Sequence, residues 1–183
     1  CQQAKTWQDA GLPKIVIAVN LSAIQFRQKR LFDIVHQALE HSGLEPSWLE
    51  LEITEGALME DTASAVVLLE RLKQLGINLA IDDFGTGYSS MGYLKHFPVD
   101  KLKIDRSFVM ELMESNQDRA IAQAVIALGH CLGLKVIAEG VEEEHQLDIL
   151  RNDLCDEYQG YYFSRPLPPQ EFVKLLSQSA KNC

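Results

Sequence analysis

The sequence predicts an α/β fold, a TIM-like (β/α) barrel, and three observations support this prediction. Short β-branched or apolar segments alternate with stretches of helical periodicity, a rhythm typical of parallel strands joined by right-handed crossover helices. Nearly every apolar segment ends in an acidic or amide residue, as expected when all strand ends surround one mouth. A doubly wound open sheet is the alternative, but no glycine-rich phosphate loop follows the first segment.

Six segments are predicted to be strands. Each is a β-branched or apolar run with a polar end, and they span residues 15–22, 49–55, 78–85, 101–107, 135–141 and 157–166. A complete eight-fold barrel averages about 250 residues, and the 183 residues provide about six of eight strand-helix units. The chain also begins on an apolar stripe with helical spacing, Ala4, Trp7 and Ala10. We therefore expect residues 1–183 to form one domain that lacks its first two strands and keeps two open strand edges.

The predicted helices have recognisable ends. The first ends at Gly43, a residue suited to the left-handed conformation that closes a helix. The second begins at Asp61, which can accept hydrogen bonds from free first-turn amides, and ends at Gly76. Three more are expected at about residues 118–133, 143–151 and 168–176.

Composition argues against several classes of protein. The 17 basic and 26 acidic residues give a formal charge of −9, which disfavours a surface for polymeric nucleic acid or an anionic membrane. No apolar run approaches the roughly 20 residues that span a bilayer, and the first residues do not resemble a secretory signal, so a cytoplasmic location is expected. The four cysteines are scattered without a CxxC pair, which disfavours a structural zinc or a disulfide framework.

The polar residues at the six strand ends form the candidate site. They are Asn20, Glu52 with Glu55, Asp82 with Asp83, Lys103 with Asp105, Glu139 with Glu142, and Gln159. Carboxylate and amide oxygens suit Mg²⁺ or Mn²⁺. Adjacent acids such as Asp82 and Asp83 can hold two such ions roughly 3.5–4 Å apart, the arrangement that clamps both oxygens in phosphoester cleavage. Lys103 suits contact with a phosphate or with the attacking water.

Each of these residues also has a simpler interpretation. An acid at a strand end often only caps the next helix, and the acids as a set could form a structural ionic network with Arg106 and Lys101. The two glycines in residues 82–90 predict a tightly turning loop that either closes over a substrate or simply connects a strand to a helix. Glu55 lies three residues beyond Glu52 and is expected to anchor this loop.

Six ordered motifs resemble the EAL domain family over essentially the whole chain. They are Asn20-Leu21-Ser22, Glu50-Leu51-Glu52-Ile53-Thr54-Glu55, Asp82-Asp83-Phe84-Gly85-Thr86-Gly87-Tyr88-Ser89-Ser90, Lys101-Leu102-Lys103-Ile104-Asp105-Arg106-Ser107-Phe108, Ala138-Glu139-Gly140-Val141-Glu142 and Gln159-Gly160-Tyr161. The resemblance implies a TIM-like barrel with one strand reversed. It also implies a phosphodiesterase that uses two Mg²⁺ or Mn²⁺ ions to hydrolyse cyclic di-GMP to linear pGpG.

The resemblance assigns a role to each matching position. Asn20, Glu52 and Asp82 resemble the ligands of the first metal, and Asp82, Asp83 and Glu139 resemble the set around the second. The catalytic positions are Lys103, which resembles the lysine that orients the water, Glu139, and Glu55, which resembles the glutamate that holds the loop. The substrate positions are Gln159, Asp105 and Lys103. Pairing of two copies, and sensory or GGDEF-type domains elsewhere in the same protein, are further implications.

The chain departs from the family pattern at its front. The Glu-Ala-Leu signature, whose glutamate ligates metal, would precede Cys1, and Glu55-Gly56-Ala57-Leu58 belongs to another motif. A second hypothesis is therefore an EAL-like module of impaired activity that binds cyclic di-GMP and signals to a protein partner. A purely structural interaction domain is a third hypothesis, and it leaves the acids without an explanation.

Overall fold

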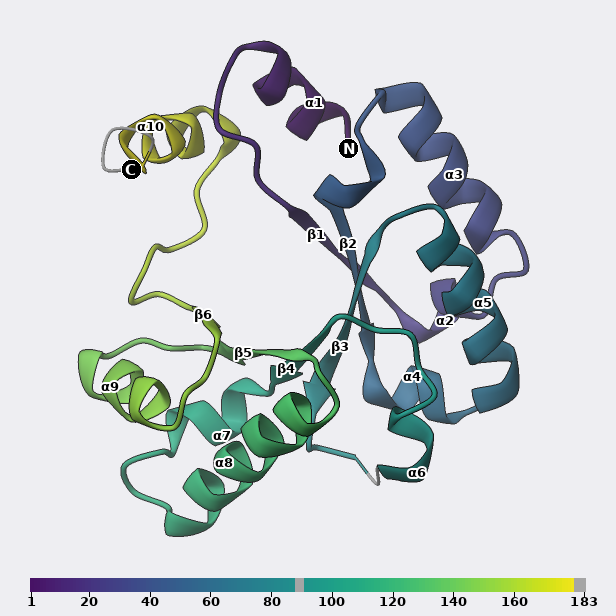
Figure 1. Cartoon of the computed structure of the whole chain (residues 1–183). Coiled ribbons are helices and arrows are strands. Elements are labelled where there is room, and N and C mark those ends of the chain that lie inside the picture. Colours follow the sequence, from purple (N-terminus) through teal and green to yellow (C-terminus); the bar gives the residue numbers. More distant parts are fainter. Residues whose placement is uncertain (88–90, 180–183) are drawn as a thin grey trace.

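Six parallel strands form one sheet that curls into a half-barrel, with the helices on its outside (Figure 1). This computed structural model describes residues 1–87 and 91–179. The strands occur in chain order across the sheet: β1 Ile17–Leu21, β2 Leu49–Thr54, β3 Asn78–Phe84, β4 Lys101–Ile104, β5 Lys135–Glu139 and β6 Glu157–Gln159. The predicted fold class is confirmed, with a strand in each of the six predicted segments.

The register brings the carboxyl ends of the strands to one edge of the half-barrel. Asn20 lies opposite Glu52, and Glu139 lies opposite Gln159. All five strand pairings are parallel, so the reversed strand that the resemblance implied is not among these six. Within the described residues β1 pairs only with β2 and β6 only with β5, which leaves the outer edges of both strands unpaired in the ladder.

The long helices begin and end close to the predicted residues. They are α1 Gln2–Asp9, α3 Leu31–Ser42, α5 Thr62–Gln74, α8 Asn116–Cys131, α9 Glu144–Asn152 and α10 Pro169–Ser179. Gly43 ends α3 in the left-handed conformation at φ 67°, and the Asp61 carboxylate accepts a hydrogen bond from Ser64 N at 3.2 Å ahead of α5. Trp7 of α1 lies 5.4 Å from Phe172 of α10, between ring centroids, so the first and last helices are in contact.

Short helices follow several strands and were not predicted. They are α2 Ala23–Phe26, α4 Glu55–Met59, α6 Met91–Leu94 and α7 Arg106–Met110, with a 3₁₀ turn, η1 Pro46–Trp48, before β2. Hydrophobic periodicity cannot identify helices of four or five residues, because one turn contains too few positions to repeat. These short helices fix the direction in which each strand end leaves the sheet.

All six predicted strand segments are longer than the observed strands, and those at 101–107 and 157–166 extend furthest beyond the observed carboxyl ends. β4 ends at Ile104 because Asp105 caps α7, its side chain accepting a hydrogen bond from Ser107 N at 2.9 Å. β6 ends at Gln159 because Gly160 lies directly against Val141, where a Cβ would stand 2.1 Å from the Val141 carbonyl oxygen. The chain then turns, with Phe163 N donating to Gly160 O at 3.1 Å.

The hydrophobic core lies between the outer face of the sheet and the helices. Ile53, Leu79, Leu102 and Val136 of four successive strands are almost fully buried, as are helix residues such as Leu69. Apolar side chains on one strand face and polar ones on the other follow from the two-residue repeat of a strand. Among the described helices, none is both long and apolar enough to cross a bilayer.

Candidate metal centre and active site

Lys103 stands at the centre of a buried acid cluster on the inner side of the half-barrel. Its ammonium nitrogen lies 2.8 Å from Glu52 Oε1 and 3.1 Å from Asp82 Oδ1, and it also contacts Glu139 Oε1. These three carboxylates come from β2, β3 and β5, whereas Lys103 belongs to β4. Four strands that are far apart in the sequence therefore present their charged side chains to one point.

The cluster changes the ionisation of its members. Burial by itself would lower the pKa of Lys103, but the hydrogen bonds and charges of Glu139 and Glu52 outweigh burial and raise that pKa above its usual value. Burial raises the pKa of Glu139, although contact with Lys103 partly opposes the shift. Lys103 is therefore a fixed positive charge that donates hydrogen bonds.

Asn20, Glu52 and Asp82 bring three polar groups together in the way predicted for a first metal. The Asn20 amide lies beside Asp82 Oδ2 and Glu52 Oε2, and in one orientation its nitrogen donates to these atoms at 3.0 and 3.1 Å. In the other orientation its oxygen faces both carboxylates, and three oxygens so placed form the ligand set of a hard divalent cation. The donor chemistry therefore fits Mg²⁺ or Mn²⁺.

Asp82, Asp83 and Glu139 bring together the residues predicted for a second metal. Each offers a carboxylate oxygen, and the three oxygens lie within 4.8 Å of one another. Asp83 has a backbone φ of 54°, a left-handed conformation that turns its side chain back beside Asp82. Burial, followed by the charges of Asp82 and Asp105, raises the pKa of Asp83, which is the direction expected where carboxylates crowd together.

Glu55 holds the start of the loop that follows β3. It is 3% exposed at the first position of α4, and its Oε2 accepts a hydrogen bond from Gly85 N at 3.1 Å. Gly85 has φ 98°, a conformation that favours glycine, and a Cβ on Gly87 would stand 3.0 Å from Glu55 Oε1. Glu55 therefore contacts the loop, and its role in anchoring that loop stays a prediction. The last residues of the predicted loop motif, 88–90, lie outside the described residues.

Of the predicted substrate residues, Lys103 stands at the centre of the cluster, whereas Gln159 and Asp105 act on its members from neighbouring strand ends. Gln159 Nε2 donates to Glu139 Oε1 at 2.7 Å, so it orients that carboxylate. Beside these two residues is a hollow of about 590 Å³ that is also lined by aromatic side chains, among them Tyr161. Asp105 caps α7, the simpler role of an acid at a strand end, while its charge also acts on Asp83.

The structural network with Arg106 and Lys101 does not hold the cluster together. Lys101 lies at the opposite end of the strands, where it pairs with Glu50 at 3.2 Å and Glu157 at 3.0 Å. Arg106 pairs with Glu142 at 3.0 Å, near the protein surface. Among the described residues, the ion pairs of the cluster carboxylates are with Lys103.

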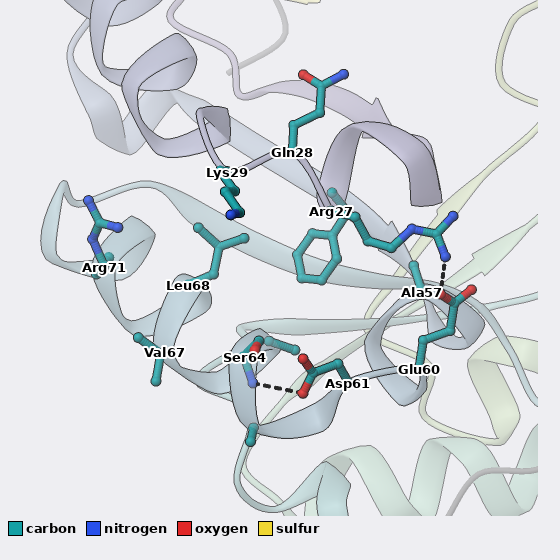
Figure 2. Close-up of a pocket in the computed structure, with 13 residues that line it drawn as sticks. Arg27, Gln28, Lys29, Ala57, Glu60, Asp61, Ser64, Val67, Leu68 and Arg71 are labelled. Carbon is teal, nitrogen blue, oxygen red and sulfur yellow. Dashed lines mark hydrogen bonds and ion pairs between the residues drawn. The ribbon is translucent and has the colours of Figure 1, made fainter.

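A hollow of about 770 Å³ lies away from the cluster, on the outer side of the fold (Figure 2). The segment after α2 and the residues of α4 and α5 line it, and Figure 2 shows Arg27 reaching across to Glu60. No cluster residue contributes to its wall. The converging charges, and not the volume of a hollow, therefore locate the candidate site.

One buried polar residue, in the helix that follows β5, was not identified from the sequence. Gln146 of α9 is 6% exposed, and its Oε1 accepts hydrogen bonds from Glu142 N at 2.8 Å and Glu143 N at 3.1 Å. A glutamine three residues after a helix-capping position is a known signature of helix starts, so the spacing of Glu143 and Gln146 could have indicated this contact.

Comparisons with known proteins agree with this fold. The model of the family described as "EAL domain" matches residues 1–166. Cyclic di-GMP phosphodiesterase NbdA of Pseudomonas aeruginosa is 50% identical over 176 residues, 96% of this chain and 22% of NbdA. The bifunctional diguanylate cyclase/cyclic di-GMP phosphodiesterase MucR of Pseudomonas aeruginosa is 47% identical over 177 residues, 97% of this chain and 26% of MucR. The chain thus spans about a fifth to a quarter of these relatives.

Solved structures of EAL domain proteins are also similar to this chain. A structure of the PaMucR phosphodiesterase in its c-di-GMP complex superposes with a TM-score of 0.91 at 47% identity, covering 94% of this chain and 70% of that one. The EAL domain of Mycobacterium smegmatis DcpA also gives 0.91, at 38% identity, covering 97% and 80%.

Fold and site together define a half-barrel protein with an acidic, lysine-centred cluster at the carboxyl ends of its strands. The chain belongs to the EAL domain family. Relatives in this family bear the name of cyclic di-GMP phosphodiesterase, and the enzyme class of the family is therefore that of a phosphodiesterase.

Proposed function

We propose that this chain carries the metal-dependent centre of a phosphodiesterase that hydrolyses cyclic di-GMP to linear pGpG. The observation that supports this most strongly is the meeting of Glu52, Asp82 and Glu139 around Lys103, with Asp83 and Asn20 beside them. Three carboxylates around one lysine leave negative charge in excess, which divalent cations would neutralise. The relatives named for this activity support cyclic di-GMP as the substrate.

The ligands of the ions follow from the oxygen positions. Asn20, Glu52 and Asp82 would hold one ion, and Asp82, Asp83 and Glu139 a second. When bound, Mg²⁺ or Mn²⁺ supplies Lewis-acid polarisation of the phosphoryl group and of the attacking water.

The remaining steps belong to side chains of the chain. Lys103 stays protonated because its pKa is raised, so it donates a hydrogen bond to the water or to a phosphoryl oxygen and does not act as a base. Glu139, which contacts Lys103 and borders the second ion position, would accept the proton of the water. Gln159 orients Glu139, Glu55 holds Gly85 and so the start of the loop, and Asp105, whose charge acts on Asp83, would contact the substrate.

Two broader assignments rest on the relatives. MucR combines this activity with a diguanylate cyclase, and we place the chain likewise in a signalling protein with sensory or GGDEF-type partners. Pairing of two copies and a cytoplasmic site of action belong to the same proposal.

Turnover of cyclic di-GMP in Mn²⁺ tests the proposal. Because the solved PaMucR chain is longer than the matched region, we would assay both the 183-residue chain and a hybrid in which the unmatched part of PaMucR is joined to it. The Asp82→Asn hybrid should lose turnover by roughly 100-fold or more, since Asp82 serves both ion positions, while binding of cyclic di-GMP persists. Equal turnover in the Asp82→Asn and parent hybrids would refute the metal mechanism.

The same experiment decides the second hypothesis. A parent hybrid that binds cyclic di-GMP without forming pGpG would indicate a binding module that signals to a partner. A parent hybrid that neither binds nor hydrolyses it would overturn both assignments.

A further inference from the structure

Gln146 joins the segments that follow two neighbouring strands, β4 and β5. Its Oε1 accepts hydrogen bonds from Glu142 N and Glu143 N, in the loop after β5, and its Nε2 donates to Val109 O of α7 at 3.3 Å. α7 follows β4, the strand that carries Lys103, while the other loop follows Glu139. One amide therefore spans the two strand ends that bring Lys103 and Glu139 into contact.

Helix capping explains only half of these contacts. A glutamate at position 146 would serve equally well as the acceptor for the two amides at the start of α9. It could not donate to Val109 O, because an ionised carboxylate has acceptors only. The contact that requires glutamine is the one to α7, and Val109 is completely buried, so its carbonyl would have no ready substitute donor from solvent.

A second connection between the same loops is weaker. Arg106 and Glu142 pair at 3.0 Å, but their side chains are 53% and 37% exposed, and ion pairs with that much solvent contact contribute little to stability. Gln146 is 6% exposed, and a buried polar group that loses its hydrogen-bond partner costs more stability than such an exposed ion pair. The buried amide is therefore the firmer of the two links.

The loop that Gln146 holds also positions the other neighbour of Glu139. Val141 N donates to Gln159 O at 3.1 Å, and Gln159 in turn donates through Nε2 to Glu139 Oε1. A shift of residues 140–143 away from α7 would thus move the hydrogen-bond donor on Glu139 as well as its distance to Lys103. Partners behind a metal or catalytic ligand typically change affinity or activity by about 10–100-fold when they are removed.

We propose that Gln146 is a positioning residue for this site: its buried amide links the β4 and β5 ends and sets the contact between Lys103 and Glu139. The proposal rests on the function proposed above, because it assigns a task to that same site. It predicts that the donor half of the amide, and not the capping half, matters for turnover.

The test compares three variants of the chain and of its PaMucR hybrid. Gln146→Glu keeps the cap and loses the donor to Val109 O. Gln146→Met loses both, and Asp61→Ala is a matched control that removes the cap of α5 without touching the cluster. Thermal unfolding, amide hydrogen exchange of residues 101–110, Mn²⁺ affinity, and kcat and KM for cyclic di-GMP are measured on each.

The proposal expects Gln146→Glu to speed exchange in residues 101–110 and to lower kcat and Mn²⁺ affinity by about 10-fold or more, with KM within twofold. Gln146→Met should show at least the same loss, and Asp61→Ala should lose thermal stability only. Unchanged kcat and Mn²⁺ affinity in Gln146→Glu would overturn the proposal, even with faster exchange. If the parent hybrid itself does not turn over cyclic di-GMP, the proposed function fails. In that case hydrogen exchange and Mn²⁺ affinity still test the role of Gln146. If Gln146→Glu leaves both of them unchanged, the proposal for Gln146 is overturned.

Discussion

The two ends of the half-barrel carry similar types of charged residue, but they differ in the balance between positive and negative charge. At the amino ends of the strands, Lys101 pairs with Glu50 and Glu157, and Lys135 pairs with Glu157 at 3.4 Å, so two positive charges meet two negative ones. At the carboxyl ends, Lys103 is the one cation within the described part of the chain that pairs with Glu52, Asp82 and Glu139. We call each of these two sets of charged side chains a layer. β2 contributes Glu50 to the first layer and Glu52 to the second, and β4 likewise contributes Lys101 and Lys103.

This difference separates a structural network from a functional one. A balanced layer can be satisfied within the protein, and it adds little to stability because desolvation offsets most of the attraction. A layer with excess negative charge repels itself unless a cation joins it. Similar residue types on the same strands can therefore differ in function, and the balance of charge indicates which end of the half-barrel binds ligands.

The largest expected effect separates the two glutamates of β2. Glu52→Gln should lower turnover of cyclic di-GMP in the PaMucR hybrid by roughly 100-fold or more, because it removes a carboxylate that contacts Lys103 and faces Asn20. Glu50→Gln, in the balanced layer, should leave kcat within about twofold. Assays of pGpG formation check both variants, and equal losses would show that the two layers do not differ in function.

The two lysines of β4 should differ in their effect on stability. Lys103→Met leaves three carboxylates crowded without their cation, and removing one partner of a buried ion pair costs about 3–5 kcal/mol. Lys101→Met should cost less, since the Lys101 side chain is 17% exposed and Lys135 still pairs with Glu157. Denaturant unfolding of the chain without divalent ions measures both, and a smaller loss for Lys103→Met would contradict the comparison.

Divalent ions should stabilise only one of the two ends. Mn²⁺ at about 100 times its dissociation constant adds about 2.7 kcal/mol of folding stability, which corresponds to a rise in Tm of roughly 5–10 °C for a chain of this size. Asp82→Asn should largely remove that rise, whereas Glu50→Gln should retain it. An equal rise in both variants would place the ion elsewhere.

Sequence alone predicted much of this protein. The apolar runs identified all six strands, while Gly43 and Asp61 marked the ends of helices, because backbone conformation at these points depends on neighbouring residues. Polar residues at strand ends also indicated the site, since parallel strands send their carboxyl ends to one edge. The metal, catalytic and substrate roles of Asn20, Glu52, Asp82, Asp83, Lys103, Glu139, Glu55, Gln159 and Asp105 remain predictions.

The tertiary structure decided which charges meet. The sequence placed Lys103 nearer than Lys101 to the end of a predicted strand, but it could not show the partners of either lysine. The parallel register and the curl of the sheet give Lys101 a balanced set of partners and Lys103 an excess of carboxylates. The link from Gln146 to Val109, 37 residues away in the sequence, likewise exists only after α7 and α9 have packed together. Such contacts depend on packing between distant segments, which local sequence does not encode.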